Sequence, residues 1–243
     1  MRTERKGMKE QKEACLICGA ELEYFTEARE QNCAICGDRK VTNACCKNGH
    51  FVCDACHMEQ GIKELLQYGL EETSGNPIEI IQKWMGQEQI HMHGPEHHVL
   101  VGAALLIAYA GSGGKIDREQ ALREMWERGR SVPGGICGFW GCCGSAVSSG
   151  IFLSLITETT PFSRKTWGLS NQMTSRALIR IGKTGGPRCC KRSAFLVIKE
   201  AAAFTEEHLG VKMQMPDRIV CGFSERNSEC LGTSCPFFKG NEA

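Results

Sequence analysis

The spacing of the cysteines near the N-terminus constrains this chain more than any other feature. Eight of the sixteen cysteines fall within the first 56 residues. Cys15 and Cys18 form one C-x2-C pair, and Cys33 and Cys36 form a second, each followed by glycine. A C-x2-C turn supplies two of the four sulfur or nitrogen ligands of a tetrahedral zinc ion. The glycine lets backbone amides turn toward the thiolates. The spacing therefore predicts metal ligation instead of small apolar thiols in a core.

Two further ligand pairs follow within a few residues. They consist of Cys46, His50, Cys53 and Cys56. Four pairs fill two zinc sites, and the sequence leaves the pairing open. Either successive pairs share an ion, or the pairs alternate between the two ions in a cross-brace. A β-hairpin between the first two cysteine pairs and a helix that begins near Ala55 complete a predicted zinc-ribbon or treble-clef module over residues 15–57.

Length, charge and hydropathy narrow the class of protein. The chain has 243 residues and a net charge of +1, so its overall charge indicates no particular partner. Residues 1–14 form a charged tail without an apolar run, which argues against a signal peptide. The longest apolar stretch, residues 99–110, is shorter than the roughly 20 residues that cross a bilayer. We therefore expect a cytoplasmic protein with no membrane partner, whose cysteines are ligands and reactive thiols instead of disulfides.

Residues 58–243 are predicted to form a helical domain, so the expected fold class is mainly α with a small β-rich N-terminal module. Asn76 and Asp117 each stand where a helix N-cap is expected, and Pro77 follows Asn76 at a first helical position. The segment 96–110 is apolar on nearly all faces and is expected to be the central buried helix. Further helices are predicted over residues 61–70, 118–130, 145–157, 167–181 and 187–209.

Three clusters in the helical domain carry candidate chemistry, and the first is rich in histidine. Residues 91–98 hold four of the seven histidines. Metal ligation and acid–base chemistry both suit imidazoles beside a helix start, while capping and buried hydrogen bonding are the structural alternative. The candidate catalytic residues here are His91, His93 and His97.

The second cluster is a glycine-rich loop over residues 133–145 that precedes a helix. Its thiols are Cys137, Cys142 and Cys143. A helix N-terminus presents free amides and a positive dipole end, which stabilise a thiolate, an anion or the sulfides of a cluster. We therefore take these three cysteines as further catalytic candidates, against the alternative of a purely structural turn.

The third cluster, residues 185–192, lies in a basic setting. Between residues 159 and 199 there are nine basic residues and no acidic one. Arg188, Lys191 and Arg192 flank a predicted helix start, where the helix dipole disfavours cations unless an anion is close. These three residues are therefore candidates for binding a small anionic molecule as substrate.

Three cysteines follow the last predicted helix. Cys221, Cys230 and Cys235 need a fourth partner, which either Cys189 or Cys190 can supply, and we assign it to Cys190. Proline follows Cys235, as it follows the last ligand of bacterial ferredoxin motifs. The expected cofactors are thus two zinc ions together with one iron–sulfur cluster or a third zinc.

Several of these motifs also resemble a known family. The matching runs include CLICG, CAICG, GHFVCDACH, IHMHGPEHHVLVGAAL, VPGGICGFWGCCGSAVSSGIF, GGPRCCKR and CPFF. The chain resembles a cysteine-rich domain-of-unknown-function family of anaerobic bacteria and archaea, some of whose members are joined to radical-SAM modules. The resemblance covers nearly the whole chain, implies metal binding, and suggests a radical-SAM or redox protein as a partner. No radical-SAM C-x3-C-x2-C signature occurs in this chain itself.

Two functions compete on this basis. The first is a metal-binding protein whose His/Cys pocket carries out redox or sulfur chemistry on a small anionic substrate. The alternative is a zinc-braced scaffold that binds a protein or a nucleic acid without catalysis. Within residues 15–57, four basic residues stand against five acidic residues before Cys45, a poor electrostatic match for nucleic acid. The sequence therefore favours the first function and argues against a nucleic-acid partner.

Overall fold

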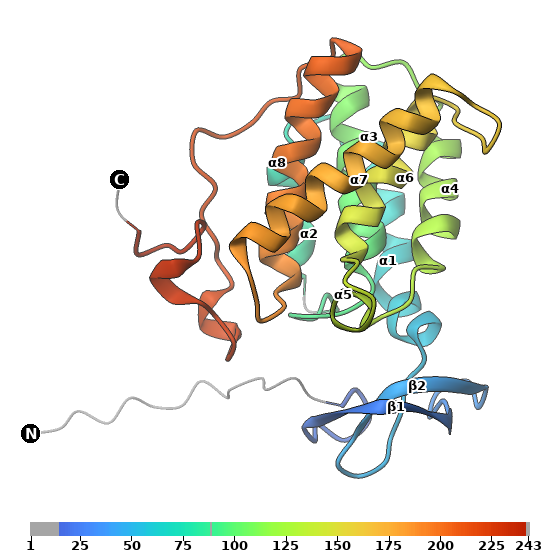
Figure 1. Cartoon of the computed structure of the whole chain (residues 1–243). Helices are drawn as coiled ribbons and strands as arrows, with labels where there is room; N and C mark the ends of the chain where they lie inside the picture. Colours follow the sequence, from blue (N-terminus) through green and yellow to red (C-terminus); the bar gives the residue numbers. More distant parts are fainter. Residues whose placement is uncertain (1–14, 88, 242–243) are drawn as a thin grey trace, which may run out of the picture.

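The computed structural model describes residues 15–87 and 89–241, without the side chains of residues 58, 60, 61 and 63–65. The tail predicted over residues 1–14 lies outside the described residues. A small two-stranded module lies at one end of a helical bundle, and a single long helix leads from the module into the bundle (Figure 1). The predicted fold class, mainly α with a small β-rich N-terminal module, is confirmed.

The module is built on one antiparallel hairpin. Strand β1 (Leu22–Asn32) pairs with strand β2 (Arg39–Cys46), with an irregularity between Tyr24 and Arg29. Leu22 stands opposite Cys46, so the end of β2 lies beside the start of β1. An isolated bridge joins Cys33 to Phe51. Helix α1 (Asp54–Glu71) begins directly after Cys53, close to the predicted start.

The helical bundle follows the predicted helices closely. Its elements are α2 (Pro77–Met85), α3 (His97–Gly111), α4 (Arg118–Arg130), the short α5 (Ile136–Phe139), α6 (Gly144–Ile156), α7 (Lys165–Thr184) and α8 (Cys190–Leu209). Both predicted caps form: the Asn76 side chain accepts hydrogen bonds from the amides of Ile78 and Glu79, and Asp117 accepts one from Gln120. The caps are local in sequence, which is why they could be predicted.

Helix α3 is the centre of the bundle, as its apolar sequence predicts. It packs against α1, α2, α4, α6 and α8 (Figure 1). Leu105 and its apolar neighbours along the helix have no exposed surface. The buried Ser148 hydroxyl of α6 accepts a hydrogen bond from the Gly102 amide at 2.8 Å. The small residues of α6 therefore allow the two helices to approach closely.

One helix start differs from the prediction. Helix α8 begins at Cys190 and not at Pro187, and Cys189 is its N-cap, with a sulfur that accepts a hydrogen bond from the Arg192 amide at 3.4 Å. Proline fixes its own backbone dihedral and suits a first helical turn, but it does not require one. Because the helix begins three residues later than predicted, the side chains of residues 187–192 face other directions than the predicted helix would give them.

The described residues after α8, 210–241, return to the bundle, and their only helices are two short 3₁₀ turns, Ser224–Arg226 and Gly232–Ser234. The Gln214 amide donates to the Gly75 carbonyl at 2.9 Å. The Phe237 ring packs edge-on against Phe195 of α8 at 5.4 Å between centroids. Figure 1 shows this red segment beside α8. None of the described helices is long and apolar enough to cross a membrane.

The position of α3 predicts a large cost for a cavity at its centre. Leu105→Ala should lower the free energy of unfolding by about 2–5 kcal/mol, because the lost side chain is fully buried among other helices. Leu70→Ala is the matched control, since Leu70 is 41% exposed and should change stability little. Urea unfolding followed by circular dichroism measures both. Equal effects of the two substitutions would contradict the buried position of α3.

Candidate metal centres

The first group of ligands comes from the two ends of the hairpin. Cys15, Cys18, Cys46 and His50 place one ligand atom each within 4.8 Å of the others. The sulfurs of Cys18 and Cys46 are 3.8 Å apart, and Nδ1 of His50 lies 3.2 Å from the Cys18 sulfur. Tetrahedral bonds of about 2.3 Å separate two sulfurs by roughly 3.8 Å, so the spacing fits a single zinc-sized ion.

The second group comes from the second C-x2-C turn and the start of α1. Cys33, Cys36, Cys53 and Cys56 again lie within 4.8 Å by their sulfurs. The sulfurs of Cys36 and Cys53 are 3.8 Å apart. Cys53 and Cys56 are three residues apart at a helix start, so both face the same side. This group is a four-thiol site of the kind that holds a structural metal ion.

Hydrogen bonds prepare several of these thiols for a metal. The Ile17 amide donates to the Cys15 sulfur, and the Ile35 amide donates to the Cys33 sulfur, each at 3.4 Å. Burial raises the pKa of Cys33, but backbone amides, that of Cys53 first, outweigh it and lower the pKa to about 6. Such bonds favour the thiolate, which is the form that binds metal.

The ligand pairs alternate between the two groups. The first and third pairs share one group, and the second and fourth share the other. Hairpin register explains the choice: pairing of Leu22 with Cys46 brings the end of β2 back to the first C-x2-C turn. The Cys33–Phe51 bridge sets the second turn beside Cys53. Of the two arrangements that the sequence leaves open, the structure has the cross-brace.

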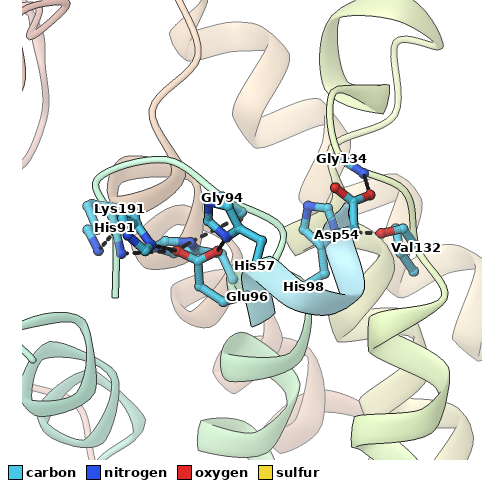
Figure 2. A network of polar contacts seen from close by, with 10 residues as sticks. Asp54, His57, His91, Gly94, Glu96, His98, Val132, Gly134 and Lys191 are labelled. Carbon is cyan, nitrogen blue, oxygen red and sulfur yellow. Dashed lines mark hydrogen bonds and ion pairs between the residues drawn. The ribbon is translucent and has the colours of Figure 1, made fainter. Parts of the chain in front are cut away.

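A third group lies where the module meets the bundle. His57, His91 and Glu96 place one ligand atom each within 4.8 Å of the others. His57 Nδ1 is 3.4 Å from one Glu96 carboxylate oxygen, and His91 Nδ1 is 3.8 Å from the other. Figure 2 shows both imidazoles converging on the carboxylate. The donor set is two nitrogens and one carboxylate from three separate segments.

Each member of this group, which we call the His57 centre, is fixed by its own segment. His57 follows directly after Cys56 on α1, so the second cysteine group fixes its place. Glu96 is the N-cap residue of α3, and one of its oxygens accepts the His91 amide at 3.1 Å. The Lys191 ammonium donates to the His91 carbonyl at 2.8 Å. A Cβ at Gly94 would fall 2.0 Å from the Glu96 carboxylate, so a larger residue at that position would displace the carboxylate.

The buried carboxylate needs a positive charge beside it. Glu96 has a 2% exposed side chain. Burial raises its pKa, but the interaction with His57 and the nearby imidazole charges outweigh burial and lower the pKa to about 2. Burial lowers the pKa of His57, and Glu96 more than compensates, so that the pKa is raised. A proton on His57 or a metal ion between the two side chains can supply the charge, and these compete.

The other histidines of the cluster bond to groups outside the His57 centre, although His97 Nδ1 also lies 3.7 Å from a Glu96 oxygen. Burial lowers the pKa of His97 to about 3, and its Nδ1 lies 3.1 Å from the Gly94 carbonyl. His98 Nδ1 lies 3.0 Å from the Val132 carbonyl, and burial lowers its pKa. His93 Nε2 is 3.4 Å from the Asn227 side-chain oxygen, toward the C-terminal segment. Of the three predicted catalytic histidines, only His91 belongs to the His57 centre.

The Cys190 thiol at the start of α8 lies within electrostatic reach of the His57 centre. Burial raises the pKa of Cys190, the Gly94 amide lowers it, and the charges of Cys143 and Glu96 raise it further. Cys190 therefore lies between the histidine segment and the glycine-rich loop. Partial burial of the thiol and the charge of Cys143 also raise the pKa of Cys137, although the residue as a whole is exposed. Burial and the charge of Cys143 raise the pKa of Cys142 as well.

The three predicted anion-binding cations have different roles in the structure. Arg192 donates to the carbonyls of Gly185 and Pro187, and the fully buried Lys191 holds the His91 carbonyl. Both cations are therefore occupied by backbone carbonyls. Arg188 stacks on the Tyr24 ring and donates to its hydroxyl at 2.7 Å, and it also lowers the pKa of Cys190.

The C-terminal cysteines gather around a different residue from the one expected. Cys189, Cys221, Cys230 and Cys235 line one pocket. Cys190, the predicted fourth ligand, does not line this pocket, and the charges of Cys143 and Glu96 act on its pKa. Neighbouring residues at a helix start point about 100° apart, so only one of two vicinal cysteines can face the tail. Cys189, the N-cap, is that residue.

Sequence reasoning missed two members of the His57 centre. His57 and Glu96 were visible beside stronger motifs, but neither was assigned a role as a ligand. The available signal was that His57 directly follows the last cysteine of the module, so any fold of the module would present it on α1. No feature of the neighbouring sequence indicates that α1 places His57 beside Glu96.

The folded bundle and its ligand groups define a cysteine-rich helical protein with a module whose cysteine groups could hold metal ions. A family model described as a family of unknown function, DUF5714, matches residues 65–238, and the chain belongs to this family. The match begins within α1, after the cysteine module and His57. Neither a curated protein nor a solved structure matches the chain significantly.

The alternating pairs predict which cysteines lose protection together. Cys18→Ala should release one metal ion and make Cys46 reactive to an alkylating reagent, while Cys53 stays protected. Cys36→Ala should do the reverse, because Cys53 belongs to its group. Metal analysis and mass spectrometry of alkylated peptides measure both outcomes. If Cys18→Ala exposes Cys33 instead of Cys46, successive pairs share an ion and the cross-brace is wrong.

Proposed function

We propose that this protein is a metal-dependent enzyme in which the His57 centre holds a catalytic metal ion beside reactive thiols. The two cysteine groups of the module hold structural zinc ions. The reaction class is redox or sulfur chemistry on a small anionic substrate. In this proposal the two cysteine groups are closed structural sites, whereas the His57 centre is an open site that can bind water or substrate.

One observation carries the proposal. Among the described residues, His57 Nδ1, His91 Nδ1 and Glu96 Oε2 are buried and have no hydrogen-bond partner. Tetrahedral bonds of about 2.1 Å to nitrogen or oxygen place two ligand atoms roughly 3.4 Å apart. The His57–Glu96 separation is 3.4 Å, longer than an ordinary charge-assisted hydrogen bond. A metal ion would satisfy all three atoms at once.

The number of ligands supports a catalytic instead of a structural role. Each group in the module supplies four ligands, which closes a tetrahedral site. The His57 centre supplies three and so leaves a coordination position for water or substrate. Two histidines and one carboxylate are a donor set of catalytic zinc and of ferrous iron. Metal analysis distinguishes these two ions.

The adjacent thiols support sulfur or redox chemistry. Cys190 lies within electrostatic reach of both Glu96 and Cys143. Without a cation at the centre, burial keeps the pKa of the Cys190 thiol raised. A metal ion beside Glu96 would stabilise the thiolate and make it a nucleophile, because a nearby positive charge favours the charged form.

The substrate class follows from the remaining charge. Arg188 is the predicted anion-binding residue whose charge reaches both Cys137 and Cys190. Its guanidinium stacks on Tyr24 of the module, so the module and the bundle meet at this position. A small anion held there would lie beside the thiols. A radical-SAM or redox protein partner and a cytoplasmic location remain predictions from the sequence.

Glu96→Gln tests the metal directly. The substitution keeps the size of the side chain but removes the charged ligand, so the protein should bind one metal ion fewer per chain. Glu127→Gln is the matched control, because the Glu127 side chain on α4 is exposed, and this variant should keep the full metal content. Metal content is measured by elemental analysis after anaerobic purification, with circular dichroism to check the fold.

A second variant keeps the test decisive if Glu96→Gln unfolds. His91→Gln removes a ligand from a loop residue with a 35% exposed side chain and should lose the same single ion. Both variants should keep the two ions of the module. Unchanged metal content in a folded variant would show that Glu96 and protonated His57 form an ion pair, and the catalytic centre would be refuted.

The scaffold alternative has its own supporting observation. Leu16, Ile17 and Ile35, which lie within the C-x2-C turns, are 39%, 45% and 47% exposed. Exposed apolar side chains on a rigid turn suit a protein partner. This function predicts that substitutions in these turns abolish activity in cells while Glu96→Gln leaves it unchanged, the reverse of the enzyme proposal.

A further inference from the structure

The four C-terminal cysteines form a site that is separate from the His57 centre. Cys189 is the N-cap of α8, and the other three come from three different turns of the segment after it. The pocket that they line is otherwise largely apolar, with Phe195, Phe223 and Phe237 among its walls. We propose that Cys189, Cys221, Cys230 and Cys235 bind a [4Fe–4S] cluster.

Amide–sulfur hydrogen bonds mark these cysteines as ligands. The Phe223 amide donates to the Cys221 sulfur and the Gly232 amide to the Cys230 sulfur, each at 3.4 Å. Both bonds run from the residue two positions after the cysteine. The same two-residue geometry, at the same 3.4 Å, holds Cys15 in the first metal group of the module.

Cys189 is prepared in a comparable way. The Arg192 amide at the start of α8 donates to its sulfur at 3.4 Å, and the Asn227 side-chain amide lies 3.6 Å from it. The N-terminal end of the 20-residue α8 carries partial positive charge. A cluster with four thiolates carries net negative charge, and this helix end together with Arg192 at the pocket wall offsets it.

The arrangement of the sulfurs favours a cluster over a single zinc ion. Zinc turns deliver two ligands each, as in the module, whereas here every ligand comes from its own turn. Among the described residues, these four sulfurs do not gather within 4.8 Å of one another as the two module groups do. In a cluster each cysteine binds a different iron, so its sulfurs stand further apart than they do around one ion.

The segment has little regular secondary structure of its own. It has no helix beyond two 3₁₀ turns in its described part, residues 210–241. Yet Cys235 and Phe237 are 7% and 6% exposed, and the Cys221 amide donates to the Phe237 carbonyl at 2.7 Å. A centre that joins three turns to α8 would add cross-links to this packing.

Anaerobic reconstitution of the full-length protein with ferrous iron, sulfide and a thiol reductant tests the proposal. The wild type should take up about four acid-labile sulfides per chain and turn brown, as a cubane cluster requires. Cys230→Ala and Cys221→Ala should each lose the sulfide and the visible absorption. Cys45→Ala is the matched control, because Cys45 belongs to none of the ligand groups found among the described residues.

The outcomes separate this proposal from the one above. Glu96→Gln should leave the content of labile sulfide unchanged, because the metal ion proposed for the His57 centre is not part of an iron–sulfur cluster. A colourless wild type without labile sulfide would overturn the cluster, and a zinc ion lost in Cys230→Ala but kept in Glu96→Gln would show that these cysteines hold zinc instead. Equal sulfide in wild type and Cys230→Ala would overturn the ligand assignment. Neither result bears on the His57 centre, which is tested by the metal content of Glu96→Gln and His91→Gln.

Discussion

The buried carboxylate of Glu96 is the constraint on which the arrangement around it depends. An ionised carboxylate with a 2% exposed side chain is very costly unless a positive charge and donors surround it. His57, the His91 amide and the glycine at position 94 are all placed to meet that need. The same requirement brings together α1, the histidine segment and the N-terminus of α3.

Helix α1 couples the metal-binding module to this carboxylate. Its first residues include two cysteines of the second metal group, and the next residue is His57. Asp54 on the same turn accepts the Gly134 amide of the glycine-rich loop at 2.7 Å (Figure 2). A metal ion in the second group would therefore fix the helix start that presents both residues. Loss of that ion should disturb the His57 centre even though the two groups share no ligand.

Local features of the fold could be predicted from the sequence, and long-range ones could not. The Asn76 and Asp117 caps and the buried 99–110 helix depend on neighbouring residues or on uniform apolarity. The alternation of ligand pairs depends on hairpin register, which the two C-x2-C turns do not encode. The choice of Cys189 over Cys190 depends on the residue at which α8 begins. The position of His57 beside Glu96 depends on the direction in which α1 runs from the module into the bundle.

A crystal structure of anaerobically purified wild type, with anomalous diffraction recorded on both sides of the iron and zinc absorption edges, tests the central claim most directly. The account predicts an anomalous peak bonded to His57 Nδ1, His91 Nδ1 and a Glu96 oxygen, with an open coordination position. It also predicts zinc peaks in the two groups of the module. A fully occupied module with no peak at Glu96, and a direct hydrogen bond from His57 to its carboxylate, would contradict it.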